Sequence, residues 1–465
     1  MVEELEISGF NQSLLTYMNK LTIQGLSLIA TSLLLFFIIF SFQRKEYVHV
    51  EDGKFVHDGN VVNCIGTNFW YGPILGSEGR GGNRDRLKKE LDLLKDLGVN
   101  NLRILVGSDG PEGVAYKVEP VLQKEPGVYN DTLLIGLDYL LAEMADREMY
   151  AVLYFNNSWE WSGGYGQYLE WAGEGKALLP SVDGYENYVY HVRRFVHNEK
   201  AKQLYYDHVR NIVTRVNTVT GEPYAEDPTI FSWQIGNEPR AFARDSLTKT
   251  AFHDWMCQSA ALIKSLDSNH MVSSGSEGLY GCEVDLDLFE KIHADENFDY
   301  LNIHIWPLVW RWVDKDTFAD SVHVAIEKTE EYMTLHFPVA ERLGKPIILE
   351  EFGYPRDGQK KEEGTADKFW DGVSLSKDSS TGARDAYYEY VFKRLVESCA
   401  DGEPLAGVNF WGWGGYATQS AVNEFWRPGD DYCGDPAQEP QGLFSVYATD
   451  LSTVDLIRKY NSLLR

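Results

Sequence analysis

The sequence predicts an α/β protein, a (β/α)8 TIM barrel, on two observations. Eight short runs rich in β-branched and aromatic residues recur along the chain, and most are separated by amphipathic stretches of helical length. Polar and aromatic residues stand at the carboxyl ends of these runs, where barrel proteins carry their functional groups. The candidate strands cover 61–69, 100–106, 149–155, 229–236, 270–276, 299–306, 345–353 and 405–413.

Further elements surround the predicted barrel. Residues 47–64 read YVHVEDGKFVHDGNVVNC, where Asp-Gly and Gly-Asn are turn signals, so a short N-terminal hairpin is expected. The stretch 86–98, RLKKELDLLKDLG, has helical periodicity, and Gly98 is placed to close that helix. No linker or repeat interrupts residues 46–465, which we expect to form one catalytic barrel. The stretch 357–385 reads as a long inserted loop at the carboxyl ends of the strands, where it would wall one end of a cleft.

The composition limits the partners. With 465 residues, 44% of them hydrophobic, the chain can bury a sizeable core. Acidic residues outnumber basic ones 70 to 43, for a net charge of −27, which excludes nucleic acid as an expected partner because phosphate binding needs clustered Lys and Arg. The five cysteines are too few and too scattered for a disulfide scaffold or a zinc-ligand pattern. We expect a monomer that uses no metal and no cofactor.

Two more motifs suggest binding hypotheses. The glycine-rich segment GSEGRGG (76–82) is reminiscent of a phosphate loop, but it lacks Gly-Lys-Ser/Thr and follows the first strand as a loop, so nucleotide binding is not expected. Asp430 and Asp431 form an acidic pair that could hold calcium, although a solvated loop is the more ordinary explanation.

The N-terminal segment 1–45 is expected to act as a signal peptide or a signal anchor. Residues 21–42 contain no charged side chain and are long enough to span a bilayer. Because acidic residues precede this run, Met18 is an alternative start. A buried core helix is the structural alternative. We expect a secreted or extracytoplasmic protein, attached to a membrane only through residues 21–42 if they are retained.

Two glutamates carry the predicted chemistry. Glu238 ends the fourth strand in WQIGNEP, and Glu351 ends the seventh in ILEEFG. Two carboxyl groups about 5–5.5 Å apart, one protonated and one ionised, cleave a glycosidic bond with retention of configuration. Opposite sectors of a barrel can bring these two side chains face to face. Strand alternation predicts that the neighbouring Glu350 faces the other way and has a structural partner outside the pocket.

From about residue 60 to 420, the chain resembles glycoside hydrolase family 5, with Asn-Glu-Pro after strand four and Glu-Phe-Gly after strand seven. The resemblance implies that Glu238 is the general acid/base and Glu351 the nucleophile. It further implies that Asn237 holds the 2-hydroxyl of the sugar and that Arg103, in NLRIL, keeps the nucleophile ionised. The remaining expected substrate contacts are His304 and Trp306 near the carboxylates, Trp411 as the aromatic floor, and Asn157, Trp70 and Trp159.

The segments GTNFWYG (66–72), FNNSWEWSGGYGQYLEW (155–171) and HIWP (304–307) resemble the β-mannanase branch of this family. The resemblance implies an endo-acting, retaining hydrolase of mannan, glucomannan or galactomannan. Many family members carry a His at the end of strand three, where this chain has Asn156-Asn157. The sequence therefore leaves open which residue of the third strand contacts the sugar. The alternatives are a β-1,4-glucanase and a catalytically inactive glycan-binding barrel. The sequence leaves open whether cutting is internal or from chain ends.

Overall fold

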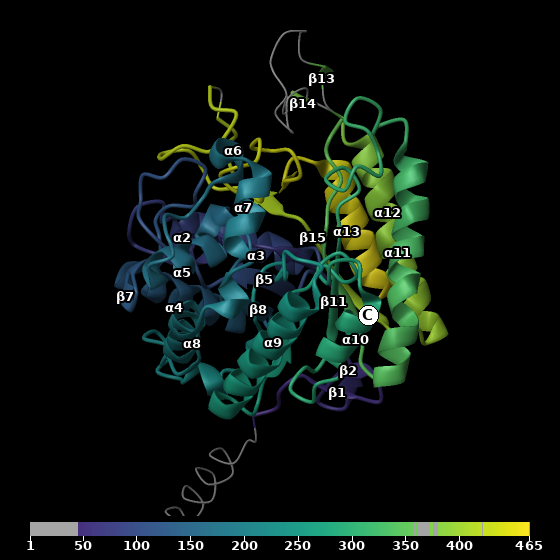
Figure 1. Cartoon of the computed structure of the whole chain (residues 1–465). Coiled ribbons are helices and arrows are strands. Elements are labelled where there is room, and N and C mark those ends of the chain that lie inside the picture. The colour runs from purple at the N-terminus through teal and green to yellow at the C-terminus, as the bar shows by residue number, and fades with distance from the viewer. Residues whose placement is uncertain (1–44, 358, 361–372, 375–379, 421, 465) are drawn as a thin grey trace, which may run out of the picture. The chain divides into compact units, whose positions relative to one another are not determined.

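The computed structural model describes residues 45–357, 359–360, 373–374, 380–420 and 422–464 (Figure 1). The chain divides into a unit of residues 1–46 and a compact unit of residues 47–465. The predicted signal or anchor, with its apolar run 21–42, lies outside the described residues. In the described part, no helix is both long and apolar enough to cross a bilayer.

A parallel sheet of eight strands forms a nearly closed barrel in the described chain, as predicted. Its order is β10-β9-β8-β5-β4-β15-β12-β11. The two end strands approach each other, since the N–H of Asp299 donates to the carbonyl of Val272 at 2.9 Å. Each strand falls within a predicted run: β4 Cys64–Asn68, β5 Asn101–Leu105, β8 Tyr150–Tyr154, β9 Ile230–Gln234, β10 Met271–Ser273, β11 Leu301–Ile305, β12 Ile347–Phe352 and β15 Leu405–Phe410.

Helices surround the barrel (Figure 1). The predicted helix 86–98 is α3, Arg84–Asp96, and it begins where the side chain of Asn83 accepts the N–H of Arg86. Gly98 follows the helix at φ +84°, a conformation that glycine adopts readily. Other helices around the barrel are α4 Asp131–Ala145, α8 Glu199–Val213, α9 Ser246–Leu266, α10 Leu286–His293, α11 Val322–Leu343, α12 Gly382–Asp401 and α13 Leu451–Leu463.

The expected N-terminal hairpin is present, with a third short strand. It comprises β1 His49–Glu51, β2 Lys54–His57 and β3 Asn60–Val61, paired antiparallel. Phe55 of β2 packs edge-on against the rings of Phe231 and Tyr300. The hairpin therefore closes the amino-terminal end of the barrel and leaves the carboxyl end for the functional groups.

Long connections follow several strands at that carboxyl end. The one after β5 contains β6 Gln123–Glu125 and β7 Val128–Tyr129. The one after β8 contains α5 Gly164–Ala172, α6 Pro180–Asp183 and α7 Tyr185–Val192. A third, after β15, contains β16 Trp413–Gly415 and β17 Val446–Tyr447. Most of the predicted loop 357–385 lies outside the described residues; its described part includes the pair β13 Gln359–Lys360 and β14 Val373–Ser374.

Candidate active site

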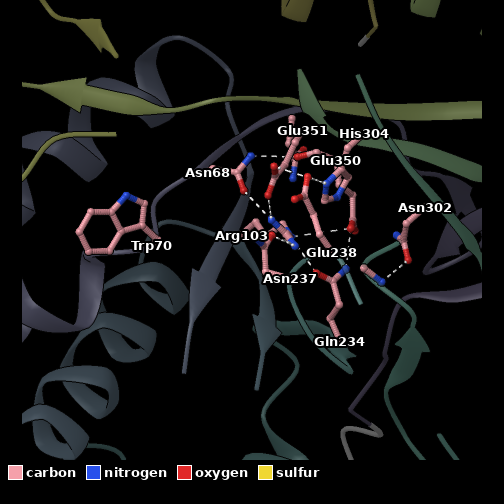
Figure 2. A network of polar contacts seen from close by, with 12 residues as sticks. Asn68, Trp70, Arg103, Gln234, Asn237, Glu238, Asn302, His304, Glu350 and Glu351 are labelled. Atoms are coloured by element: carbon pink, nitrogen blue, oxygen red, sulfur yellow. Dashed lines mark hydrogen bonds and ion pairs between the residues drawn. The ribbon is translucent and has the colours of Figure 1, made fainter. Parts of the chain in front are cut away.

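Glu238 and Glu351 meet at the carboxyl end of the barrel, as their positions in the sequence predict (Figure 2). Glu351 belongs to β12, whereas Glu238 follows β9 at φ +50°, unusual for a residue with a side chain. The N–H of Glu238 donates to the carbonyl of Gly275 at 3.0 Å, which holds this backbone in place. Strain at a residue of this kind is typical of functional sites.

His304 lies between the two carboxylates. Its Nδ1 atom is 3.0 Å from Oε1 of Glu238 and 3.4 Å from Oε2 of Glu351. One side-chain oxygen of each glutamate and one His304 nitrogen all lie within 4.8 Å of one another. This separation suits retaining chemistry, because inverting enzymes hold their carboxyls roughly 6.5–9.5 Å apart to admit a water.

The same three side chains form the one group of donor atoms in the described residues that is close enough to share a metal ion. Burial lowers the pKa of His304 well below its ordinary value, so the imidazole is neutral. A neutral imidazole donates one N–H, and the nearby carboxylate oxygens accept it. Hydrogen bonding therefore accounts for the close approach of these three side chains.

A β-bulge places Glu350 and Glu351 next to each other inside the barrel. Along β12, Leu349 pairs with Ile303 and Glu351 pairs with His304, so Glu350 is the extra residue. Glu350 accepts hydrogen bonds from Gln234 at 2.5 Å and Tyr300 at 3.1 Å. Glu350 does have structural partners, but the prediction that it faces away from Glu351 is wrong, because the bulge interrupts the alternation.

Arg103 links the nucleophile position to the surrounding network. Its side chain is fully buried and donates to Glu351, to Oδ1 of Asn237 at 2.9 Å and to Gln234 at 2.7 Å. Its Nε atom is also 3.7 Å from a carboxylate oxygen of Glu350. One guanidinium thus contacts both acidic residues of β12 and the Asn237 side chain; of these contacts, the sequence predicted the one with Glu351.

The two catalytic carboxyls titrate as a coupled pair. Burial raises the pKa of Glu351 well above its ordinary value; Arg103 lowers it, and the negative charge of Glu238 raises it. Burial also raises the pKa of Glu238, while Arg240 and the N–H of Trp159 lower it. Two such close carboxyls cannot both ionise at low cost. Burial raises the pKa of Glu351 more strongly than that of Glu238, but Arg103 donates directly to Glu351 and favours its ionised form, so the hydrogen bonding favours Glu238 as the holder of the shared proton.

The predicted asparagines lie side by side. Asn157 and Asn237 form a parallel backbone bridge beyond β8 and β9, and the amide of Asn237 donates to Oδ1 of Asn157 at 3.2 Å. Asn157 also accepts the backbone N–H of Trp159 at 3.0 Å. Asn157 therefore supports Asn237 and the Trp159 backbone rather than standing free in the pocket.

Three of the four predicted tryptophans surround the carboxylates. Trp159 donates its indole N–H to Glu238 at 2.5 Å, and Trp306 donates to Glu351 at 3.3 Å. Trp411 packs edge-on against Trp306, with ring centroids 5.9 Å apart, and its indole N–H has no partner among the described residues. Trp70 instead lies apart from the polar network and donates to the carbonyl of Gly434 at 2.9 Å (Figure 2).

Two further groups at the site escaped the sequence analysis. Glu277, which follows β10 and is 1% exposed, forms a two-point ion pair with Arg240. Glu439, in the long connection after β15, has a buried Oε2 without a partner among the described residues. Burial raises its pKa well above normal, and the charges of Asp435, Glu351 and Glu238 raise it further. For Glu277, the only signal in the sequence was its partner Arg240, which stands two residues after Glu238.

A barrel with two carboxyls at this separation, one tied to a buried arginine, defines a retaining glycoside hydrolase. The model of the family described as "GH family 5 beta-mannosidase-like" matches residues 45–465, and the chain belongs to this family. The resemblance found in the sequence is thereby confirmed.

Similar proteins include the glycoside hydrolase family 5 mannosidase of Rhizomucor miehei, with 32% identity, coverage of 90% of this chain and 97% of that one, and a TM-score of 0.79. The putative mannan endo-1,4-beta-mannosidase 9 of Oryza sativa subsp. japonica is 28% identical over 79% of this chain and 81% of its own length. The endo-1,4-beta-mannanase of Rhizomucor miehei, at 21% identity over 90% of this chain and 99% of that one, shares the fold with a TM-score of 0.64.

Proposed function

We propose that this protein hydrolyses β-mannosidic linkages with retention of configuration. The observation that carries the proposal is the convergence of Glu238 and Glu351 around His304, with Arg103 bound to Glu351. Buried and paired in this way, the two glutamates can divide the roles of acid and nucleophile.

The reaction would proceed in two displacements. The carboxylate of Glu351 attacks the anomeric carbon, the bond from that carbon to the glycosidic oxygen breaks, and this oxygen takes the proton of Glu238. A glycosyl ester on Glu351 remains. A water molecule then donates a proton to the Glu238 carboxylate while the water oxygen attacks the anomeric carbon. The ester bond to Glu351 breaks, and Glu351 is released as a carboxylate. Asn237, oriented by Arg103 at 2.9 Å, would bind the 2-hydroxyl of the sugar throughout.

We propose an endo-acting β-1,4-mannanase acting on mannan, glucomannan or galactomannan. Support comes from relatives named mannan endo-1,4-beta-mannosidase, among them one that is 28% identical over 376 residues. A β-1,4-glucanase shares the mechanism and differs in the sugar it accepts. A catalytically inactive glycan-binding barrel is disfavoured, because both carboxylates, Asn237 and Arg103 are assembled.

An exo-acting β-mannosidase is the second candidate, favoured by Glu439. The connection after β15 brings this buried carboxylate into the electrostatic field of Glu351 and Glu238. A loop that covers one side of the catalytic pair would shorten the cleft into a pocket for chain ends. The Rhizomucor miehei family 5 mannosidase also matches with a higher TM-score, 0.79, than the endo-mannanase of the same organism, 0.64.

Product analysis decides between these candidates. Residues 46–465 are incubated with unbranched β-1,4-mannan, and released sugars are followed by chromatography alongside viscosity. A rapid fall in viscosity with manno-oligosaccharides of mixed length supports endo action. Mannose or mannobiose alone, at nearly constant viscosity, supports the exo-acting candidate. Cleavage of soluble cellulose derivatives without cleavage of mannan would contradict both in favour of a glucanase.

We further propose that residues 1–45 export the catalytic barrel, so that it acts outside the cytoplasm as a monomer. The uncharged run 21–42 supports this location, which also places the enzyme beside its polymer. Fractionation of cells that make the full chain tests it: enzyme in the medium or in the membrane fraction is expected, and enzyme in the cytosol would contradict it. Size-exclusion chromatography with light scattering tests the monomer.

A further inference from the structure

A pocket of about 230 Å³ lies between two loops at the carboxyl end of the barrel. One wall is the glycine-rich segment around residues 80–83, which follows β4. The other is the segment 426–432, which follows β15. Because β15 pairs directly with β4, both loops leave neighbouring strands, and the pocket lies on the same face as the catalytic glutamates.

The pocket brings together two motifs that the catalytic site leaves unexplained. Arg80, from the glycine-rich segment, lines one side, and the acidic pair Asp430 and Asp431 lines the other. Two aromatic residues complete the lining: Trp426 and Tyr432, whose rings are stacked with centroids 5.2 Å apart. Aromatic carbon atoms next to charged hydrogen-bonding groups are a combination that suits a sugar ring, with its apolar faces and its rim of hydroxyls.

The charges around the pocket disfavour an ionic ligand. Arg80 is paired with Glu119 at 2.9 Å and with Glu112 at 3.3 Å. An anion would therefore meet these carboxylates together with Asp430 and Asp431. A cation would meet the guanidinium of Arg80 and that of Arg86, which also lines the pocket. A neutral ligand with many hydroxyls avoids both penalties.

The acidic pair is already engaged in holding its own loop, which also argues against a calcium site. Asp430 accepts the side-chain amide of Asn423 at 2.9 Å and the backbone N–H of Arg427 at 2.9 Å. Asp431 accepts the backbone N–H of Thr418 at 2.8 Å. These bonds fix the shape of the pocket wall and leave lone pairs for hydroxyl donors.

The pocket is connected to the catalytic site by packed groups. The ring of Tyr432 lies edge-on to that of Trp70, with centroids 6.2 Å apart. Trp70 donates to Gly434, and the same segment continues to Glu439, whose pKa is raised by the charges of Asp435, Glu351 and Glu238. A volume of about 230 Å³ is also many times the ~10–15 Å³ of this kind of volume that one water needs, so the pocket can hold more than a single water.

We propose that this pocket binds one neutral hexose unit of the polysaccharide away from the bond that is cut. The unit is either a further residue of the mannan backbone or a galactosyl branch, which share the same recognition chemistry. The proposal rests on the proposed β-mannan substrate and adds a distal binding site to it.

Two variants test the pocket from different directions. Trp426→Ala removes the aromatic wall. Pro428→Trp adds a large side chain at an exposed lining position and should plug the space. Val422→Trp is the matched control, because Val422 is 89% exposed on the same connection and does not line the pocket. Each is assayed on an aryl β-mannoside, on linear mannohexaose and on galactosyl-branched manno-oligosaccharides.

Both pocket variants should raise KM for an oligosaccharide that reaches the pocket by about tenfold, a change of ~1.4 kcal/mol, with unchanged kcat/KM on the aryl mannoside. A rise with mannohexaose assigns the pocket to a backbone unit, and a rise confined to branched substrates assigns it to the branch. If Trp426→Ala also lowers kcat/KM on the aryl mannoside, the pocket proposal is judged from Pro428→Trp alone. Unchanged KM in the plug variant on both oligosaccharides overturns the pocket proposal alone. A wild-type enzyme inactive on every β-mannoside overturns the proposed function itself.

Discussion

Arg103 and Glu351 form an ion pair in which both side chains are almost fully buried, at 0% and 3% exposure. Arg103 belongs to β5 and Glu351 to β12, so the pair exists only when the barrel is closed. The same guanidinium reaches Asn237, which couples the nucleophile to the group expected to hold the 2-hydroxyl. Removing one partner of a buried pair is much more harmful than removing an exposed one.

Replacing Arg103 with Met should therefore lower both stability and activity. The uncompensated carboxylates are expected to cost about 3–5 kcal/mol of unfolding free energy. Because Arg103 lowers the pKa of Glu351, its loss should also move the acid limb of the kcat/KM profile to higher pH. Denaturant unfolding and a pH–rate profile measure the two effects.

The control for Arg103 is a second ion pair away from the site. Arg215 donates to Asp138 at 2.8 Å and 2.6 Å, in a network that does not contact the catalytic glutamates. Arg215→Met should lose stability without shifting the acid limb. An unshifted acid limb in folded Arg103→Met would contradict the role given to Arg103.

Glu351→Ala should lower kcat on mannan by roughly 10⁴-fold or more while the protein remains folded, because no nucleophile is left. A cooperative thermal melt would establish folding, at a lower temperature than that of the wild type because Arg103 loses its buried partner. The matched control is Glu283→Ala, which removes a carboxylate that accepts the backbone N–H of Phe242 outside the catalytic pair. Appreciable turnover by Glu351→Ala would refute its assignment as nucleophile.

Glu238→Ala should lose about 10²–10⁴-fold on mannan but much less in the first step on substrates with activated aryl leaving groups, which need no proton. The wild type should lose activity as pH rises through the pKa of Glu238, which burial raises. That alkaline limb should be absent when the variant acts on the activated substrate. Equal losses on both substrates would argue against an acid role.

Buried Asp109 should make the fold less stable as pH rises. Burial raises its pKa from 3.8 to about 7, so the folded state favours the protonated form. Its contribution to stability is full below pH 4 and is lost as pH approaches 7. Asp109→Asn should flatten this part of the stability curve. Urea unfolding at pH 4 and pH 7 measures the slope, and an identical slope in the variant would contradict the prediction.

Much of the architecture was predictable because each barrel strand is a short apolar run that ends in polar residues. Glu238 and Glu351 were predictable for the same reason, since each follows a recognisable strand. The position of Glu350 was not, because a bulge depends on register with neighbouring strands and leaves no mark in the local pattern.

Glu439, which sequence reasoning missed, and Trp70, which it placed differently, both depend on a long connection. Glu439 reaches the catalytic pair through the connection after β15, whose path is set by Asp435 accepting the N–H groups of Gly442 and Phe444, each at 2.8 Å. The indole N–H of Trp70 donates to the carbonyl of Gly434 in that same connection, so Trp70 lies away from the polar network. Such contacts between loops that are distant in sequence cannot be inferred from residue spacing.

The most direct test of the two-glutamate account is the configuration of the first product. Proton NMR during the first minutes of hydrolysis of a β-mannoside separates the anomeric signals of the released sugar before they equilibrate. The account predicts that the β-anomer appears first and that the α-anomer follows by mutarotation. Initial appearance of the α-anomer would mean inversion, and it would contradict the assignment of Glu351 as a covalent nucleophile.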